Sequence, residues 1–197
     1  MKSVGLLGGS FNPVHIGHTA LAKYFVDNGV VDEVWLMVSP QNPFKQNSGL
    51  IDEKHRLAMT SLAADNLERV HVCDAELRLP KPSYTWRTLE YLTKDFPDHT
   101  FTLIIGSDNW LVFDKWAHHE EILHLYNICV YPRPGYEVAA TTELPDNVRL
   151  LNSPLYDVSS TDIRSIIANG GNADKYLDAD VAEYIKRHGI YTDRQKQ

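Results

Sequence analysis

The sequence predicts an α/β fold, a Rossmann-like parallel sheet with helices on both faces, and three observations lead to this prediction. Apolar runs of strand length alternate with helical patterns along most of the 197 residues, which is typical of parallel strands joined by crossover helices. The segment 33–39 (EVWLMVS) is nearly continuously apolar, as expected for a strand with helices on both sides. The length and a hydrophobic share of 43% fit one domain, 1–197.

The first predicted strand, at 3–8, is followed by a helix at 18–29. Apolar residues at helical spacing and the glycine at the end of the segment predict this helix. Its inner face carries Leu21, Phe25 and Ala22.

After the strand at 33–39, the segment 40–49 is rich in Pro, Asn, Gly and Ser and is predicted to be a loop. Asp52 is the expected cap of a helix over 53–65. A strand at 69–74 follows.

A connection interrupted by prolines, at 77–84, leads into a predicted helix at 85–96. The segment 100–106 (TFTLIIG) is the most strand-like run of the chain. The segments 107–113 and 118–126 look helical.

The segment 127–133 is again a predicted strand. Residues 134–150 are irregular and polar, and 148–152 (VRLLN) is a candidate last strand. Two terminal helices are predicted within 159–171 and 178–189; each segment opens on a polar cap residue, Ser159 in the first, and closes on a glycine.

Charge and cysteine usage exclude several function classes. A net charge of −7 and a pI near 5.7 argue against nucleic-acid or anionic-membrane partners, which require a basic field. Cys73 and Cys129 lie in apolar, β-prone runs, which favours buried free thiols and a reducing compartment. Neither a signal-peptide pattern nor an apolar run of ~20 residues is found, so we expect a cytoplasmic protein.

The loop GGSFNPVHIGH, at 8–18, is the first candidate site. It follows a predicted parallel strand, where ligands of such sheets bind. Gly8 and Gly9 allow a ligand close to the backbone, and the next helix offers N–H groups to an anion. Neither a dinucleotide fingerprint nor a P-loop is present.

His15 and His18 are the unusual feature of this loop. At that spacing the two imidazoles point to the same side, and Gly17 between them is expected to leave space for a ligand. The pair would donate hydrogen bonds to a phosphate. Two other interpretations are a zinc site, which lacks further ligands at suitable spacing, and a purely structural role as helix caps.

Two segments resemble the signatures of a known superfamily. GGSFNPVHIGH is similar to the N-terminal signature of the nucleotidyltransferases that share an HIGH-type motif with class I aminoacyl-tRNA synthetases. VSSTDIR, at 158–164, is similar to their C-terminal I-S-S-T-x-x-R signature, with Val158 in place of Ile. The resemblance implies a Rossmann-like fold of the nucleotidyltransferase type.

Within that superfamily the chain most resembles the bacterial nicotinate-nucleotide adenylyltransferase family, over essentially its full length. The further matching segments are NPFK (42–45), HRLAM (55–59), SYTWRTL (83–89), GSDNW (106–110), KW (115–116) and RPGY (133–136). Arg87 and Ser107 depart from the family pattern, which has Asp and Ala there in many members.

The resemblance implies that the phosphate of nicotinate mononucleotide attacks the α-phosphorus of ATP, giving a dinucleotide and pyrophosphate. It implies catalytic roles for His15, His18, Lys45 and Arg164. The implied ATP-binding residues are Gly8, Gly9, Ser10, Phe11, His18, Gly106, Asp108, Ser159, Ser160, Thr161 and Arg164. The implied mononucleotide-binding residues are Asn12, Lys45, Ser83, Tyr84, Thr85, Trp116 and Arg133.

Magnesium is the implied cofactor, carried by ATP phosphates and water without a protein ligand. Thr85, which opens a predicted helix, and nearby N–H groups should form a donor-only site that prefers the nicotinate carboxylate to an amide.

The residues leave several alternatives open. Lys45 also fits a solvated loop lysine, Arg56 a helix-surface or core-flanking ion pair, and Trp116 a partly buried residue that closes the core. An adenylyltransferase for another acceptor, nicotinamide mononucleotide or phosphopantetheine, and a non-catalytic nucleotide-binding regulator are the alternative functions. We also allow for a homo-oligomer.

Overall fold

A computed structural model describes residues 1–40, 49–139 and 142–192 of the chain. Its centre is a sheet of six parallel strands in the order β3-β2-β1-β4-β5-β6. The strands are β1 (Lys2–Gly9), β2 (Glu33–Val38), β3 (Val70–Cys73), β4 (His99–Gly106), β5 (Asn127–Tyr131) and β6 (Val148–Leu150). The predicted Rossmann-like parallel sheet is confirmed.

The long helices also match the predictions closely. They are α1 (Ile16–Asp27), α2 (Glu53–Asp65), α4 (Thr85–Asp95), α6 (His119–Leu125), α7 (Ser160–Ala168) and α8 (Ala179–His188). The Asp52 carboxylate accepts from the Lys54 N–H at 2.8 Å, so the predicted cap of α2 is confirmed. Helix α1 begins two residues earlier than expected because His15 caps it.

The short elements were predicted less well. The sequence did not predict α3 (Ala75–Arg78) or the 3-10 turn η2 (Asp174–Tyr176). The helical stretch predicted at 107–113 divides into α5 (Ser107–Trp110) and the 3-10 turn η1 (Phe113–Lys115). Such single turns have too few residues to show a hydrophobic period.

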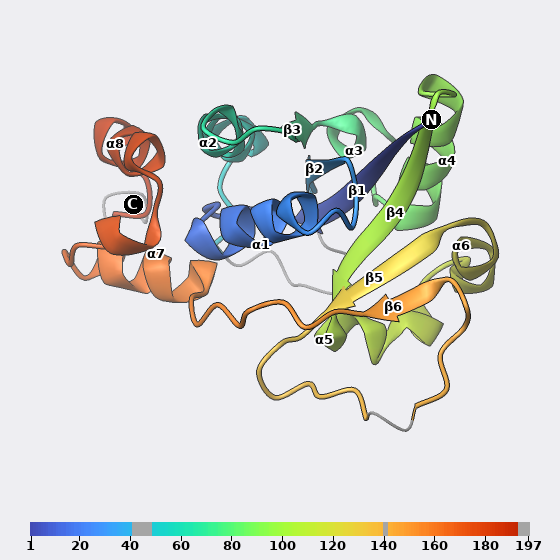
Figure 1. The fold of residues 1–197 in the computed structure, drawn as a ribbon. Helices are drawn as coiled ribbons and strands as arrows, with labels where there is room; N and C mark the ends of the chain where they lie inside the picture. The colour runs from blue at the N-terminus through green and yellow to red at the C-terminus, as the bar shows by residue number, and fades with distance from the viewer. Residues whose placement is uncertain (41–48, 140–141, 193–197) are drawn as a thin grey trace.

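Helices cover both faces of the sheet (Figure 1). One layer of the core joins α1, α2, α7 and α8 to the strands, and Leu21, Ala22 and Phe25 lie fully inside it, as predicted. The other layer joins the sheet to α4, α6 and the residues around Phe113. With a layer on each side, β1 is buried on both faces, which explains its continuous apolar run.

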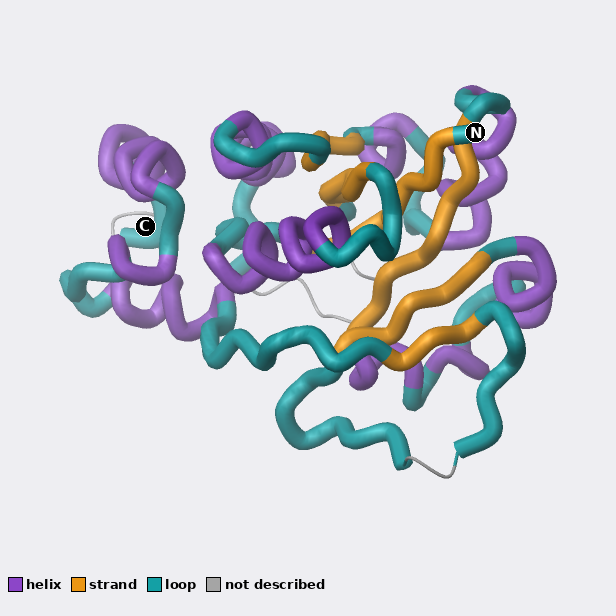
Figure 2. Tube along the Cα trace, viewed as in Figure 1, coloured by secondary structure: helices purple, strands orange, loops and turns teal. Residues whose placement is uncertain are grey.

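The connection from β6 to α7 places the C-terminal signature. Figure 2 shows residues 151–159 as a loop that runs from the edge of the sheet to the C-terminal helices. In Figure 1 these helices, α7 and α8, lie beside α1 and α2. The fold therefore brings the end of the chain back to its first helix.

Both cysteines are free and buried, as predicted. Burial raises the pKa of the Cys73 thiol to about 11 and also raises that of Cys129. Within the described ranges, no helix is long and apolar enough to cross a membrane.

Candidate active site

The strand order places a crevice between β1 and β4. Successive strands are added on one side of β1 and then, from β4 onward, on the other side. In open parallel sheets ligands bind at such a reversal, outside the carboxyl ends of the strands. The segments that follow β1, β4 and β5 meet there.

His15 and His18 cap the start of α1 together. The Nδ1 atom of His15 accepts from the Gly17 N–H at 3.2 Å, and the Nδ1 atom of His18 accepts from the His15 N–H at 3.2 Å. The ring centroids lie 3.7 Å apart at 31°. The two imidazole rings therefore point to the same side, as predicted. The structural role of His15 and His18 as helix caps is also confirmed.

These caps have a chemical consequence. An imidazole whose Nδ1 accepts a hydrogen bond carries its proton on Nε2 when neutral. His15 is neutral near pH 7, because burial first and the charge of Arg133 second lower its pKa to about 4. Both rings accordingly present an Nε2–H donor.

The Phe11 ring packs against the ring of His18. Its ring is 1% exposed and meets the His18 ring edge-on, with centroids 5.0 Å apart. The ring is thus enclosed by protein, and a contact of Phe11 with ATP stays a prediction.

The space beside Gly17 is filled by protein. A Cβ at Gly17 would lie 3.0 Å from the Val158 side chain and 3.1 Å from the His15 ring. The expectation that Gly17 leaves space for a ligand is therefore wrong. The glycine instead lets the C-terminal signature pack against the start of α1.

The C-terminal signature contacts the opening loop directly. The Ser160 hydroxyl donates to the Pro13 carbonyl at 2.8 Å. Arg164 donates to the Asn12 carbonyl at 2.8 Å and to the Thr161 hydroxyl at 3.2 Å. The two segments that the sequence singled out thus form one structural unit.

Ser159 caps α7 as expected, because its hydroxyl oxygen accepts from the Asp162 N–H at 3.1 Å. The same hydroxyl lies 2.5 Å from the Asp162 carboxylate. The hydroxyls of Ser159 and Ser160 are thus hydrogen-bonded to protein groups. An anion at this helix start would rely on its N–H groups and on Arg164.

A charged pair stands at the ends of β4 and β5. Asp108 lies 3.6 Å from the Arg133 guanidinium, and a Cβ at Gly106 would collide with the Asp108 carboxylate. Ser107, 3% exposed, accepts from the Arg133 N–H at 2.9 Å. Ser107, which stands where many family members have Ala, thus orients the backbone at Arg133.

The other predicted substrate segment lies at the start of α4. Tyr84 occupies the cap position and Thr85 the first turn, and no side chain of the described residues caps this helix. Ser83 is 6% exposed. The guanidinium of Arg87, the second departure, lies 5.6 Å from the centroid of the Tyr84 ring.

Trp116 is half-buried and packs against Phe113, with ring centroids 5.4 Å apart. Its role in closing the core is therefore real. Its Nε1–H is buried and has no hydrogen-bond partner in the described part of the chain. The adjoining segment contacts α4 through the Trp86 and His118 rings, whose centroids are 4.3 Å apart.

Asn12 is enclosed more tightly than predicted. Its side chain donates to the Gly49 carbonyl at 2.8 Å and accepts from the Ile51 N–H at 3.5 Å and the Tyr191 hydroxyl at 2.9 Å. The residue is 4% exposed. Asn12 holds the loop in place, while Lys45 lies outside the described residues.

Sequence reasoning misjudged Arg56. The residue is 1% exposed and donates to four backbone carbonyls, those of Ser10 (2.7 Å), Ser39 (2.7 Å), Pro40 (3.3 Å) and Ile51 (3.2 Å). The expected ion pair is wrong, because its partners are carbonyls. Its spacing to Met59, Thr60 and Ala63 on the buried stripe of α2 was the available signal.

Sequence reasoning also missed Glu76, in the unpredicted α3. Its carboxylate is 4% exposed and accepts from the Thr88 hydroxyl at 3.2 Å. Burial raises the pKa of Glu76, against hydrogen bonds from Ser39, Thr88 and Ser83 that lower it. A carboxylate therefore lies beneath the predicted donor-only site.

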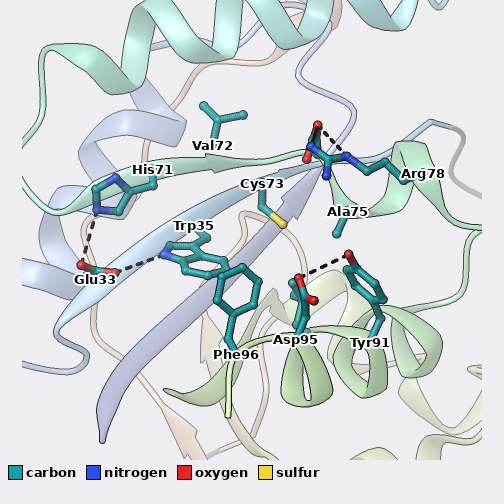
Figure 3. A pocket seen from close by; sticks show the side chains of 12 residues that line it. Glu33, Trp35, His71, Val72, Cys73, Ala75, Arg78, Tyr91, Asp95 and Phe96 are labelled. Atoms are coloured by element: carbon teal, nitrogen blue, oxygen red, sulfur yellow. Dashed lines mark hydrogen bonds and ion pairs between the residues drawn. The ribbon is translucent and has the colours of Figure 1, made fainter. Parts of the chain in front are cut away.

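A hollow of about 400 Å³ between β3 and α4 lies apart from these residues (Figure 3). The Trp35 and Phe96 rings line it side by side, and Cys73, the last residue of β3, lines it as well. None of the residues predicted for the site lines it. The site is therefore defined by the strand ends and not by this hollow.

The donor set of the site fits anions better than a metal. Its imidazole, guanidinium and backbone N–H groups donate hydrogen bonds, whereas Mg²⁺ requires oxygen ligands. In residues 1–40, 49–139 and 142–192, no group of three His, Cys, Asp or Glu side chains is arranged to hold a metal ion.

Fold and site together define a nucleotidyltransferase of the Rossmann-like type. Residues 6–166 match the model of the cytidylyltransferase-like family, and the chain belongs to that family. Two curated relatives named "Probable nicotinate-nucleotide adenylyltransferase" are similar to it. That of Bacteroides fragilis is 47% identical over 173 residues, covering 88% of this chain and 86% of the relative. That of Bacteroides thetaiotaomicron is 45% identical over 184 residues, covering 93% and 91%.

A solved structure shares the fold. It is nicotinic acid mononucleotide adenylyltransferase of Plasmodium falciparum complexed with NaAD, with a TM-score of 0.80 over 97% of this chain and 98% of that one. The sequence identity is 19%. This likeness supports the arrangement of strands and helices, while the bacterial relatives support the family.

Proposed function

We propose that the chain transfers the adenylyl group of ATP to nicotinate mononucleotide, forming nicotinate adenine dinucleotide and pyrophosphate in NAD biosynthesis. The observation that carries the proposal is the contact between the opening loop and the C-terminal signature around His15 and His18. The names of the bacterial relatives support the same activity.

In the proposed reaction, a phosphate oxygen of the mononucleotide attacks the α-phosphorus of ATP. The new P–O bond forms as the bond to the β-phosphate oxygen breaks, and pyrophosphate leaves with that electron pair. This step needs no protein nucleophile, so alignment and stabilisation of developing charge are the tasks of the protein.

His15 and His18 are the proposed donors to the α-phosphate. Because both Nδ1 atoms accept backbone N–H bonds, the donor of each neutral ring is its Nε2–H. A neutral donor needs no counter-charge in the buried site. The low pKa of His15 preserves this state across the physiological range.

The remaining ATP contacts come from several segments. Arg164 would bind β- or γ-phosphate oxygens, because its guanidinium projects from α7 beside the opening loop. Lys45 stays a prediction for the same phosphates. The other proposed ATP-binding residues are Gly8, Gly9, Ser10, Phe11, Gly106, Asp108, Ser159, Ser160 and Thr161.

The mononucleotide would lie across the start of α4. The N–H groups of the first turn and the Thr85 hydroxyl would receive the nicotinate carboxylate. Trp116 would contact the pyridine ring, and Arg133 the phosphate. We include Ser83, Tyr84 and Asn12 as residues that shape this side.

We propose Mg²⁺ as the cation that accompanies ATP, coordinated by phosphate oxygens and water. When bound, it would reduce the negative charge of the triphosphate. We assign it no ligand among the described side chains. A cytoplasmic location and a homo-oligomeric state stay predictions.

Pyrophosphate release from ATP tests the proposal. The purified chain should release pyrophosphate at a rate that depends on added nicotinate mononucleotide. Pyrophosphate release only with phosphopantetheine would identify phosphopantetheine as the acceptor in place of nicotinate mononucleotide. ATP binding without pyrophosphate release, whichever acceptor is added, would favour the non-catalytic regulator. Denatured protein serves as the control for chemical hydrolysis.

A further inference from the structure

Asn12 of the opening loop is a buried junction between segments that are far apart in the sequence. The residue is 4% exposed, and its Nδ2 group donates to the Gly49 carbonyl at 2.8 Å. Its Oδ1 atom accepts from the Tyr191 hydroxyl at 2.9 Å and from the Ile51 N–H at 3.5 Å. Its backbone carbonyl accepts from the Arg164 guanidinium at 2.8 Å. One residue after β1 thus contacts the segment before α2, helix α7 and the chain after α8.

Tyr191 makes the contact of greatest sequence separation at this junction, 179 positions from Asn12. It follows α8, which lies beside α2 in Figure 1, and is 8% exposed. Burial raises the pKa of its hydroxyl, so the group stays protonated and donates to Asn12 across the physiological range. A partner that only donates here gives the Asn12 amide one orientation, with Nδ2 toward the Gly49 carbonyl.

The backbone on both sides of this hydrogen bond is unusual. Tyr191 has a φ of 66°, and Phe11, which precedes Asn12, has a φ of 44°. Such values are rare for large side chains and persist only where the surrounding structure fixes them. Both residues are buried, so protein encloses each of them. The contact between the opening loop and the chain after α8 is therefore held in one geometry.

Asn12 lies next to the proposed catalytic groups in space and in sequence. Its carbonyl bond directs the Arg164 guanidinium, which we propose for the ATP phosphates. Pro13, the next residue, accepts at 2.8 Å from the hydroxyl of Ser160 in the first turn of α7. His15, three residues after Asn12, caps α1. A shift of Asn12 would therefore move both the α7 groups and the histidine pair.

We propose that Tyr191 is a positioning residue, which through its hydrogen bond to Asn12 holds the opening loop and Arg164 in the alignment that adenylyl transfer requires. This inference rests on the proposed function and adds a residue that lies outside both signatures. The rate of such a transfer depends steeply on alignment, and a displacement of about 1 Å costs on the order of 10²-fold. Because Tyr191 acts through Asn12, its loss should lower turnover more than it weakens the binding of either substrate.

Tyr191→Phe tests the inference by removing the hydroxyl and keeping the ring. Among the described residues, the Asn12 Oδ1 atom then retains only the long bond from Ile51. We expect kcat to fall by ~10-fold while the KM for each substrate stays within about threefold, because misalignment acts on the transition state. The variant should fold, since Arg56 also joins this loop to the segment before α2 through the carbonyls of Ser10 and Ile51.

Tyr184→Phe is the matched control. This tyrosine of α8 loses a comparable hydrogen bond, because its hydroxyl lies 3.0 Å from the Nδ1 atom of His55 on α2. That bond joins α8 to α2 without involving the opening loop. Both variants should show a similar fall in Tm, with the kcat of Tyr184→Phe within about twofold of the unmodified chain. Equal losses of kcat in the two variants, an unchanged kcat in folded Tyr191→Phe, or a loss confined to KM would each overturn the inference.

The double variant Asn12→Ala, Tyr191→Phe tests the route through Asn12. If the hydroxyl acts through the amide, adding Tyr191→Phe to Asn12→Ala should lower kcat by no more than about twofold. A further loss of ~10-fold in that background would show that Tyr191 acts elsewhere and would overturn the inference. If Asn12→Ala does not fold, the comparison of Tyr191→Phe with Tyr184→Phe decides alone. An unmodified chain that is inactive with nicotinate mononucleotide would instead reject the proposed function.

Discussion

The starts of α1 and α4 satisfy their backbone N–H groups in opposite ways. At α1, His15 and His18 accept the first N–H groups, and this exchange fixes the direction of both rings. At α4, none of the side chains that the structure describes caps the first turn. Among the described residues, the Thr85 and Trp86 N–H groups therefore remain for other acceptors, whereas the Arg87 N–H donates to the Tyr84 carbonyl at 3.0 Å.

This difference divides the proposed work between the two helix starts. A ring held by the backbone is a preorganised donor, which is the property that stabilises a transition state. An uncapped first turn is a receptor for a carboxylate, which is a property of substrate selection. We therefore expect changes at α1 to alter turnover and changes at α4 to alter the choice of substrate.

The largest effect should follow His18→Ala. Loss of one transition-state donor costs ~2.7 to 4 kcal/mol, so kcat should fall by roughly 10²- to 10³-fold. Steady-state kinetics with saturating substrates measure this change. His124→Ala, on the exposed side of α6, is the matched control. Turnover within about fivefold of the unmodified chain would remove His18 from the proposed mechanism.

The α4 side should distinguish acid from amide. A carboxylate offers two acceptor oxygens and a charge to the uncapped turn, whereas an amide offers one oxygen. Loss of a charge-assisted bond costs about 1.5 to 3 kcal/mol, so kcat/KM for nicotinate mononucleotide should exceed that for nicotinamide mononucleotide by ~10²-fold. Comparable values would show that α4 does not select the carboxylate.

The His15 cap should make folding stability depend on pH. Because its folded pKa, about 4, lies below the ordinary value of 6.5, the unfolded chain binds the proton more readily. The contribution of neutral His15 to the free energy of unfolding is complete above pH 6.5 and is lost as the pH falls toward 4. Between pH 7 and 4.5 this amounts to about 2 to 3 kcal/mol.

Urea unfolding of His15→Asn checks this contribution. Asparagine keeps a cap acceptor but does not titrate. The variant should therefore lose about 2 to 3 kcal/mol less stability than the unmodified chain over the same pH range. Equal losses in the two proteins would show that His15 does not bear the pH dependence.

The smallest effect should come from Arg164→Lys. The ammonium keeps the charge but loses the planar fork that also donates to Asn12. We expect kcat/KM for ATP to fall by ~10-fold, about 1.4 kcal/mol, with a smaller change for the mononucleotide. Arg187→Lys, exposed on α8, is the control. An unchanged dependence on ATP would separate Arg164 from the phosphates.

Local chemistry made much of the fold predictable. The Asp52, Ser159 and Asp178 caps and the glycine after α8 mark the ends of α2, α7 and α8 correctly. These signals act over three or four residues, so they are legible in the chain itself. The single turn of α3 was missed because four residues carry no period.

Roles that depend on distant residues were less predictable. The sequence predicts room for a ligand at Gly17, yet the Val158 side chain fills that space. Asn12, predicted as a mononucleotide-binding residue, also accepts a hydrogen bond from the Tyr191 hydroxyl, 179 positions away. The local sequence around residues 12 and 17 does not predict which residues from the C-terminal part of the chain contact them.

The sequence by itself determined the alternation of strands and helices, the helix caps and the two signatures, because periodicity and capping are short-range properties. The tertiary structure alone decided the tautomers of the histidine pair, the low pKa of His15 and the four carbonyls that Arg56 reaches. These features depend on burial and on contacts such as Ser160 to Pro13, 147 positions apart. Hydrogen bonds and charges gain their strength from a buried environment that exists only once the distant segments have packed.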